Sequence, residues 1–252
     1  MGLRREELAD LAGISVDYLV RLEQGRAETP SAQVAGALAR ALQLTRAERD
    51  HLYRLAGLAP PHDGLIPEHI SPGMQRVLLR LGDAPAGVFT ADWRMIWWNA
   101  GWVALHGDPA RLAPEQRSFV RSRFPVDGEK GRLGLNEVMT ADADSTDRAV
   151  VADLRRATGR YPGDPRLVTL IESRLAGNER FAQLWQEAVV ASHREDRKVV
   201  YHPQAGAITV ECDVLSDGDN DLKVVVYSVA PGSEDEARLQ FARAIGSAVT
   251  AP

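Results

Sequence analysis

The chain has 252 residues, of which 44% are hydrophobic and 26% are charged, and its formal net charge is −5. This length accommodates two domains, and the composition is that of a soluble globular protein. The single cysteine excludes an intrachain disulfide and fits a reducing compartment. No apolar run approaches transmembrane length and residues 1–5 are not a signal peptide, so we expect a cytoplasmic protein without a membrane partner.

Residues 5–24 have the spacing of a DNA-binding helix-turn-helix. Gly13 separates two short helical patterns, and a tight turn between helices needs glycine where a side chain would clash. Ala9, four residues earlier, is small enough to let the two helices cross closely. The apolar residues that we expect to face inward are Leu8, Ala12, Ile14, Leu19 and Leu22.

The second of these helices is the expected recognition helix, because its exposed N-terminal face would meet base edges in the major groove. The side chains on that face are Ser15, Val16, Asp17, Tyr18 and Arg21. Arg5, at the start of the preceding helix, is the expected phosphate contact. Residues 1–60 carry equal numbers of basic and acidic side chains, so the positive patch that binds DNA is small.

Two more short helices follow. Ser31 is the expected N-cap of one over residues 32–44, and Thr45 with Glu48 forms a capping box that opens the next, which Gly57 ends. Four short helices in this order resemble the DNA-binding domain of Xre-type and lambda-type repressors, which implies binding to double-stranded DNA. An ordinary helical bundle is the alternative interpretation.

Residues 59–70 are the expected linker, because they contain prolines and glycine without periodicity. Ser71 and Pro72 then start a helix. The pattern next predicts two strands, a short helix capped by Asn99, three longer helices, two strands and a final helix. These elements are expected over residues 86–90, 95–98, 100–107, 146–158, 165–175, 178–191, 207–215, 222–229 and 233–247. The strand over 222–229 is apolar on both faces and is expected at the centre of the sheet.

The predicted fold is therefore an all-α helix-turn-helix domain, residues 1–58, and an α+β domain with an antiparallel sheet, residues 71–252. Several sequence stretches resemble the MmyB-like transcription regulators in the same order. They are LRREELADLAGISVDYLVRLEQGR, SAQVAGALARAL, WWNA at 97–100, GRYPGDPRL at 159–167, FAQLW at 181–185, HPQAG at 202–206 and the segment 224–233. The resemblance implies a bacterial regulator whose second domain is PAS-like and holds a small apolar ligand, as one relative holds a fatty acid.

The chain departs from those relatives in three places. They carry a further Arg-rich helix before the first one here, so we expect the native start to lie upstream of Met1 or the DNA-binding domain to lack its first helix. They also have a Trp-x-x-His pattern that begins at Trp185, where this chain has Ala188 in place of the histidine. Residues 119–140 follow no family pattern.

Aromatic residues gather in the second domain, where they form either a core or the wall of a ligand cavity. We expect the cavity between the sheet and the helices over 146–158 and 178–191. The candidate wall residues are Trp98, Phe181, Trp185 and Tyr201, and the candidate partners of a ligand head group are His193 and Arg194. Trp97 and Trp98 point to opposite faces of one strand, so only one of them can face a given cavity.

Each candidate enzyme motif in the sequence lacks the residues or the structural context that its chemistry needs, so we expect neither catalysis nor a cofactor. Residues 142–146 spell the DxDxT of aspartyl-nucleophile phosphatases but lack the parallel sheet behind it, and Asp144 or Ser145 is instead expected to cap a helix. Residues 217–221 resemble a calcium loop only faintly and fit a hairpin turn. The histidines and the cysteine show no metal-ligand spacing.

The sequence thus predicts a ligand-responsive transcription regulator that binds DNA as a homodimer. The competing interpretation is a protein that binds a small molecule or lipid and whose N-terminal helices serve dimerisation or docking without binding DNA.

Overall fold

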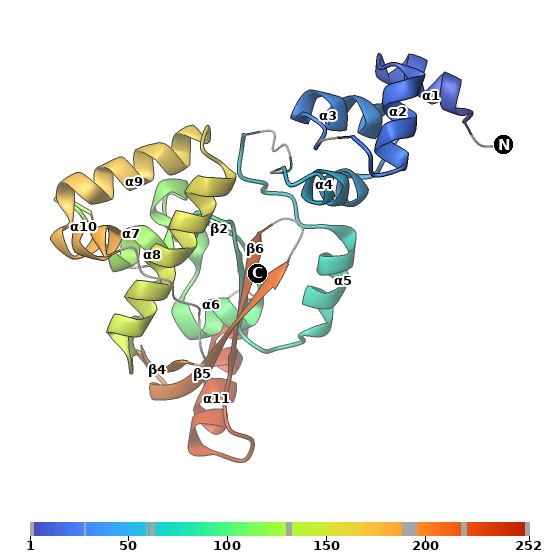
Figure 1. The fold of residues 1–252 in the computed structure, drawn as a ribbon. Helices are drawn as coiled ribbons and strands as arrows, with labels where there is room; N and C mark the ends of the chain where they lie inside the picture. Colours follow the sequence, from blue (N-terminus) through green and yellow to red (C-terminus); the bar gives the residue numbers. More distant parts are fainter. Residues whose placement is uncertain are drawn as a thin grey trace. The chain divides into compact units, whose positions relative to one another are not determined.

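The computed structural model describes residues 3–27, 29–58, 60, 64–129, 133–187, 196–217 and 221–249. The chain divides into two compact units, Met1–Asp63 and Gly64–Pro252 (Figure 1). Residues 64–70, which composition assigns to a linker, belong to the second unit. Ile66 is only 3% exposed there, and its backbone N–H donates to Asp164 Oδ2 at 2.8 Å.

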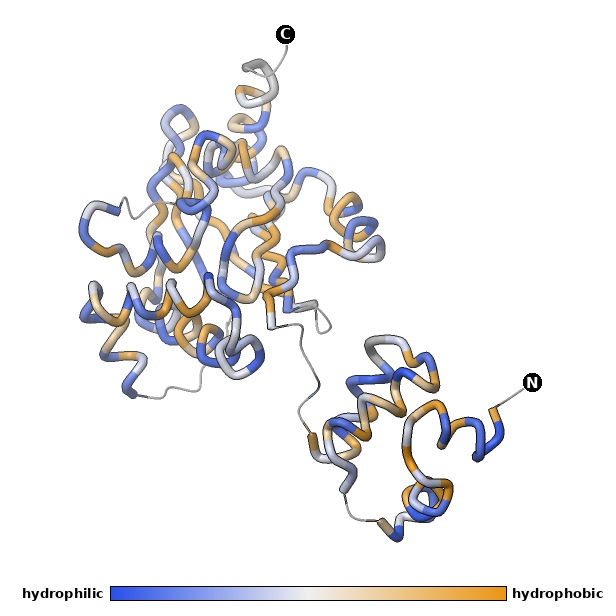
Figure 2. The backbone as a smooth tube through the Cα atoms, turned by 90° about the horizontal axis from the view of Figure 1, so that it is seen from above, coloured by the Kyte–Doolittle hydropathy of each residue, from blue (hydrophilic) through white to orange (hydrophobic). Residues whose placement is uncertain are grey.

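The first unit consists of α1 (Arg5–Ala12), α2 (Val16–Glu23), α3 (Ala32–Ala41) and α4 (Arg46–Leu55). Gly13 joins α1 to α2 with φ of +64°, the left-handed conformation predicted for this turn. Polar and apolar residues alternate every few positions along the tube of these helices, which marks helices with one buried face (Figure 2). Their core is built on Ala9, Ala12, Leu19 and Leu38, with Leu8, Ile14 and Leu22 packed against it.

The predicted helix caps of this unit are confirmed. The hydroxyls of Ser31 and Thr45 accept hydrogen bonds from backbone N–H groups in the first turns of α3 and α4. Ser15, which the sequence assigns to the DNA-facing surface, caps α2 in the same way. The Glu48 carboxylate accepts a hydrogen bond from the N–H of Thr45 at 2.8 Å, which completes the capping box.

The second unit is built on an antiparallel sheet, which confirms the predicted α+β class. The described strands are β1 (Ala86–Phe89), β2 (Met95–Trp98), β3 (Glu137–Thr140), β4 (Asp196–His202), β5 (Gly206–Asp217) and β6 (Leu222–Ser228), in the order β2-β1-β6-β5-β4-β3. The sequence pattern does not predict β3 and β4. It does predict the interior position of β6, whose neighbours are β1 and β5.

Helices cover both faces of this sheet. Figure 1 shows α5 (Pro72–Arg80) on one side and a group of helices on the other. The described helices of that second group are α6 (Ala100–His106), α7 (Phe119–Arg123), α8 (Ala143–Arg160), α9 (Pro165–Gly177), α10 (Glu179–Gln186) and α11 (Glu234–Val249), with 3₁₀ turns at Pro109–Arg111 and Pro114–Gln116. None of the helices in the described ranges is long and apolar enough to cross a membrane.

Two helices differ from their predicted bounds. Helix α8 begins three residues earlier than expected, because the carboxylate of Asp142 caps it by accepting from the N–H of Ser145. The expected caps, Asp144 and Ser145, lie inside its first turn. Helix α10 ends at Gln186, and residues 188–191 of the longer predicted helix lie outside the described residues.

Two apolar clusters hold the unit together, one on each face of the sheet. The larger lies between the sheet and α6–α11, and the smaller joins α5 to the other face through Leu78, Val88, Leu222 and Val224. Trp98 packs against the larger cluster and Trp97 against the smaller. Their predicted placement on opposite faces of β2 is thereby confirmed.

Candidate DNA-binding helix and ligand cavity

The N-terminal end of α2 presents the side chains that the sequence assigns to DNA. Val16 and Asp17 are exposed and Tyr18 is half-buried. The Ser15 hydroxyl accepts from the N–H of Tyr18 at 3.1 Å, so it already serves the helix cap. The hydroxyl proton of Ser15 and its second lone pair remain for contacts to a nucleic acid.

The two arginines of this surface are held by nearby carboxylates. Arg21 Nε lies 3.5 Å from Asp17 Oδ2, and its guanidinium carbon is 5.9 Å from the centre of the Tyr18 ring. Arg5 Nε donates to Glu23 Oε2 at 2.7 Å. Exposed ion pairs of this kind contribute little free energy, so either guanidinium can exchange its carboxylate for a phosphate or a base edge.

A cavity of about 440 Å³ lies in the second unit, between the sheet and α6, α7 and the start of α8. Its apolar wall consists of Phe89, Trp93, Trp102, Phe119, Leu133, Gly134, Val138, Ala149, Val214 and Val225. Its polar wall consists of His106, Ser122, Arg123, Asn136, Glu137, Thr140, Asp142, Ser145, Thr146, Asp196, Lys198, Cys212 and Tyr227. A space of this size that combines aromatic side chains with polar groups is typical of small-molecule sites.

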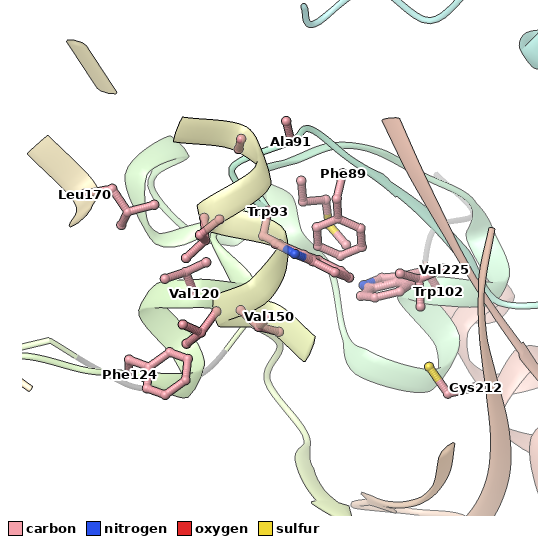
Figure 3. Close-up of a cluster of buried hydrophobic side chains, with 14 of the residues drawn as sticks. Phe89, Ala91, Trp93, Trp102, Val120, Phe124, Val150, Leu170, Cys212 and Val225 are labelled. Atoms are coloured by element: carbon pink, nitrogen blue, oxygen red, sulfur yellow. The ribbon is translucent and has the colours of Figure 1, made fainter. Parts of the chain in front are cut away.

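The aromatic side chains of the wall are packed on one another. Phe89 lies 5.6 Å from Trp93 and 5.9 Å from Trp102 between ring centres, and Trp93 lies 5.3 Å from Phe119. Figure 3 shows Phe89, Trp93 and Trp102 side by side, with Val225 next to Trp102. The indole N–H of Trp93 donates to buried Asp153 at 3.0 Å and fixes this ring.

A buried ion pair forms part of the polar wall. Lys198 of β4 is 6% exposed, and its Nζ lies 3.6 Å from Asp196 Oδ2 on the same strand. The Thr146 hydroxyl of α8 donates to the same carboxylate oxygen at 3.1 Å. On the other side, the ammonium group lies 5.6 Å from the centre of the Phe119 ring, a cation–π distance.

His106 and Trp102, one turn apart on α6, supply nitrogen atoms to the same wall. Their ring centres are 4.5 Å apart. Within the described residues, neither His106 Nε2 nor Trp102 Nε1 has a hydrogen-bond partner, although both atoms are buried. Burial and the nearby charge of Lys198 lower the pKa of His106 to about 3, so the imidazole is neutral at physiological pH.

Cys212 and Tyr227 lie beside this group on β5 and β6. Asp196 pairs with Cys212 across β4 and β5, and Cys212 pairs with Tyr227 across β5 and β6. The three side chains therefore form a row across the sheet. Burial raises the pKa of the Cys212 thiol and of the Tyr227 phenol, so both groups are uncharged.

The comparisons with known proteins follow the division into two units. Residues 70–242 match the MmyB-like transcription regulator ligand binding domain. The chain belongs to the MmyB-like transcription regulators. Residues 1–52 of this MmyB-like regulator match a helix-turn-helix domain, so it combines a DNA-binding unit with a ligand-sensing one. No curated protein matches the chain.

The aromatic residues that the sequence assigns to the cavity wall of this regulator lie outside its lining. Phe181 is fully buried and packs against Phe124 and Trp185. Trp185 is covered by the guanidinium of Arg155, 4.9 Å from its ring. These contacts place both in the packing between α7, α8 and α10, and no residue of α10 lines the cavity.

Trp98 and Tyr201 also lie outside the cavity lining. The Trp98 ring lies under the guanidinium of Arg117 at 5.4 Å. Tyr201 is 42% exposed, because strand alternation puts it on the face of β4 opposite to Lys198 and Val200. His193, Arg194 and Ala188 lie outside the described residues.

The polar wall of the MmyB-like regulator is not predicted from the sequence. Lys198, Asp196 and His106 were not candidates, because β4 was not predicted and His106 ends a short helix. One signal was available: the chain has 30 basic residues but only three lysines. Both lysines that the structure describes, Lys198 and Lys223, are buried. Across the described residues, no group of three or more His, Cys, Asp or Glu side chains could hold a metal ion.

Proposed function

We propose that this regulator binds double-stranded DNA as a homodimer through α2 and that an apolar small molecule in the cavity changes its affinity for DNA. The observation that carries the proposal is the aromatic-walled cavity of about 440 Å³ in a chain that also holds a helix-turn-helix domain. The base-contacting residues would be Val16, Asp17, Tyr18 and Arg21. A fatty acid is the first candidate ligand, because one relative holds such a molecule.

The test uses the full chain and a duplex selected from a randomised library. Fluorescence anisotropy should give specific binding whose affinity falls steeply with salt, because phosphate contacts release counterions. Native mass spectrometry of protein purified without detergent should show a bound species of lipid size. Adding a saturating apolar ligand to the delipidated protein should change the Kd for DNA.

Two outcomes would contradict the proposal in different ways. A protein that binds the ligand but no duplex would support the competing interpretation, in which α1–α4 serve dimerisation or docking. A protein that binds the duplex with the same Kd in the presence and absence of bound ligand would show that the cavity does not regulate DNA binding.

A further inference from the structure

The cavity wall contains hydrogen-bonding atoms that have no partner. Trp102 and His106 are 2% and 3% exposed, both side chains line the cavity, and Trp102 Nε1 and His106 Nε2 are buried without a hydrogen bond in the described part of the chain. An indole N–H can only donate. Because an unmet buried donor costs free energy, the natural complement of this wall is a ligand that carries a hydrogen-bond acceptor.

The charges of the same wall are already balanced. Lys198 is paired with Asp196 at 3.6 Å, and Arg123 Nε donates to Asp147 at 2.9 Å. The other charged side chains of the described lining are both acidic, Glu137 and Asp142, and both are exposed. His106 adds no positive charge, since its pKa is lowered to about 3. A buried anion would therefore find no free cation to offset its loss of hydration.

From these two observations we propose that the cavity selects an uncharged apolar ligand with a carbonyl acceptor, such as an ester, lactone, ketone or amide, over the carboxylate of the same carbon skeleton. The carbonyl oxygen accepts from Trp102 Nε1, and the alkyl part lies along Phe89, Phe119 and Val225. This inference rests on the proposed ligand-sensing function, and it replaces the fatty acid named there as first candidate by an uncharged carbonyl compound of similar chain length.

Three probes with one chain length separate the possibilities: dodecanoic acid, methyl dodecanoate and dodecan-2-one. Their affinities are measured on the delipidated full chain at pH 7.5, where the acid is ionised, by quenching of tryptophan fluorescence and by calorimetry. We expect the ester and the ketone to bind at least tenfold more tightly than the acid. An acid that binds as tightly as the ester overturns the inference.

The decisive variant is Asp196→Asn. The amide oxygen still accepts from Thr146, but the counter-charge of Lys198 is gone, so the cavity gains an unpaired cation. The affinity for dodecanoate should rise at least tenfold, while the affinity for the methyl ester stays within about twofold. An unchanged ratio of the two affinities contradicts the proposed charge balance.

Glu211→Gln is the matched control. It also removes the carboxylate of an ion pair in this sheet, but Glu211 bonds Arg197 at 2.9 Å and its side chain is 44% exposed. The ratio of acid to ester affinity should not change. Trp102→Phe supplies a second, independent test, because it keeps an aromatic ring and removes the donor. It should weaken binding of the ester and the ketone several-fold, because their carbonyl oxygen loses its donor.

The failures of the two proposals are distinguishable. Tight binding of the acid together with a ligand effect on DNA would overturn only the inferred ligand class. If none of the three probes binds to the wild-type chain, the inferred class falls. If, in addition, no lipid-sized species copurifies with the protein and added lipid does not change its Kd for DNA, the proposed ligand-sensing function is also contradicted.

Discussion

Buried lysines show how single residues organise the cavity. Lys223 Nζ lies 3.7 Å from Asp153 Oδ2, donates to the carbonyl of Ala91 at 3.3 Å and lies 5.0 Å from the Trp93 ring. Asp153 in turn accepts from the Trp93 indole. An ammonium group fits these narrow sites better than the planar guanidinium of arginine. Lys223 thus fixes Trp93 in the aromatic wall of the cavity, and Lys198 is part of the polar wall.

The first prediction concerns Arg21. If its guanidinium leaves Asp17 and bonds a guanine, Arg21→Ala should cost about 1–3 kcal/mol of DNA-binding free energy and relax specificity at one base pair. Arg5→Ala should instead weaken all duplexes alike and reduce the salt dependence. Anisotropy titrations against single-base variants of a selected duplex measure both effects. Wild-type affinity in Arg21→Ala would remove this residue from the interface.

At the scale of elements, a buried arginine ties α9 to the segment after α7. Arg174 is fully buried, its Nη2 donates to Glu129 Oε1 at 2.8 Å, and its Nη1 donates to the carbonyl of Phe124 at 2.9 Å. The hydrogen bonds from Arg174 and the charge of Arg121 hold the pKa of Glu129 at about 2, below its usual 4.5. Residues 124–129 are therefore fixed against the helix that closes this side of the core.

A pH dependence of stability follows from this pair. Because the pKa of Glu129 is lower in the folded chain, the carboxylate stabilises the fold above its usual pKa of 4.5, and this contribution is lost as the pH falls towards 2. The contribution is of the order of 1–3 kcal/mol. Urea unfolding between pH 6 and pH 3 should show it as a decline that Glu129→Gln makes shallower. An identical pH profile in wild type and variant would contradict the assignment.

Asp164 joins the start of the second unit to α9. Its Oδ1 accepts from the N–H groups of Arg166 and Leu167, and its Oδ2 accepts from the N–H of Ile66. Asp164→Ala removes a helix cap and leaves a buried N–H unpaired, which should cost about 2–4 kcal/mol of unfolding free energy. Asp164→Asn keeps one acceptor and should cost less. Denaturant unfolding of the full chain measures the order of these variants, and equal losses would show that the charge rather than the bonds matters.

The elements that could be predicted from the sequence are those whose signals are local. Gly13, Ser71 and Asn99 mark turns and caps within a few residues, and the structure confirms each. Strand β4 is not predicted, because Lys198 occupies an inward position where the alternation of a half-buried strand requires an apolar residue. Strand β3 is not predicted either, because three of its four residues are exposed and its sequence shows no alternation of apolar and polar residues. In β4, a lysine of the cavity wall thus interrupts the apolar alternation by which a strand is predicted.

The cavity could not be predicted because its wall is assembled over long distances in the chain. Phe89 and Tyr227 are both part of it, and the pairing of β1 with β6 that brings their strands together is not encoded in either segment alone. Aromatic content indicates the domain that holds the cavity but not the residues that line it, since Phe181 and Trp185 stack on each other in the core. Packing decides which aromatics remain open to a ligand.

At the scale of the whole molecule, we expect specific recognition of DNA to use two copies of the chain. One recognition helix reads only a few base pairs, so useful specificity needs two half-sites about one helical turn, or roughly 34 Å, apart. Residues 1–52 match one helix-turn-helix domain, so in this arrangement a partner copy would supply the second.

We therefore predict a homodimer at micromolar concentration and a two-fold symmetric binding site. Sedimentation velocity should give the mass of two chains, free and on DNA. Insertion of about five base pairs between the half-sites should reduce affinity strongly, because it turns them to opposite sides of the duplex, whereas insertion of a full turn of about ten base pairs should restore part of it. A monomer on DNA, or affinity indifferent to both insertions, would contradict this arrangement. The same measurements with ligand bound show whether the ligand changes the dimerisation equilibrium or the affinity of the dimer for DNA. In either case, the state that the ligand favours must bind the ligand more tightly.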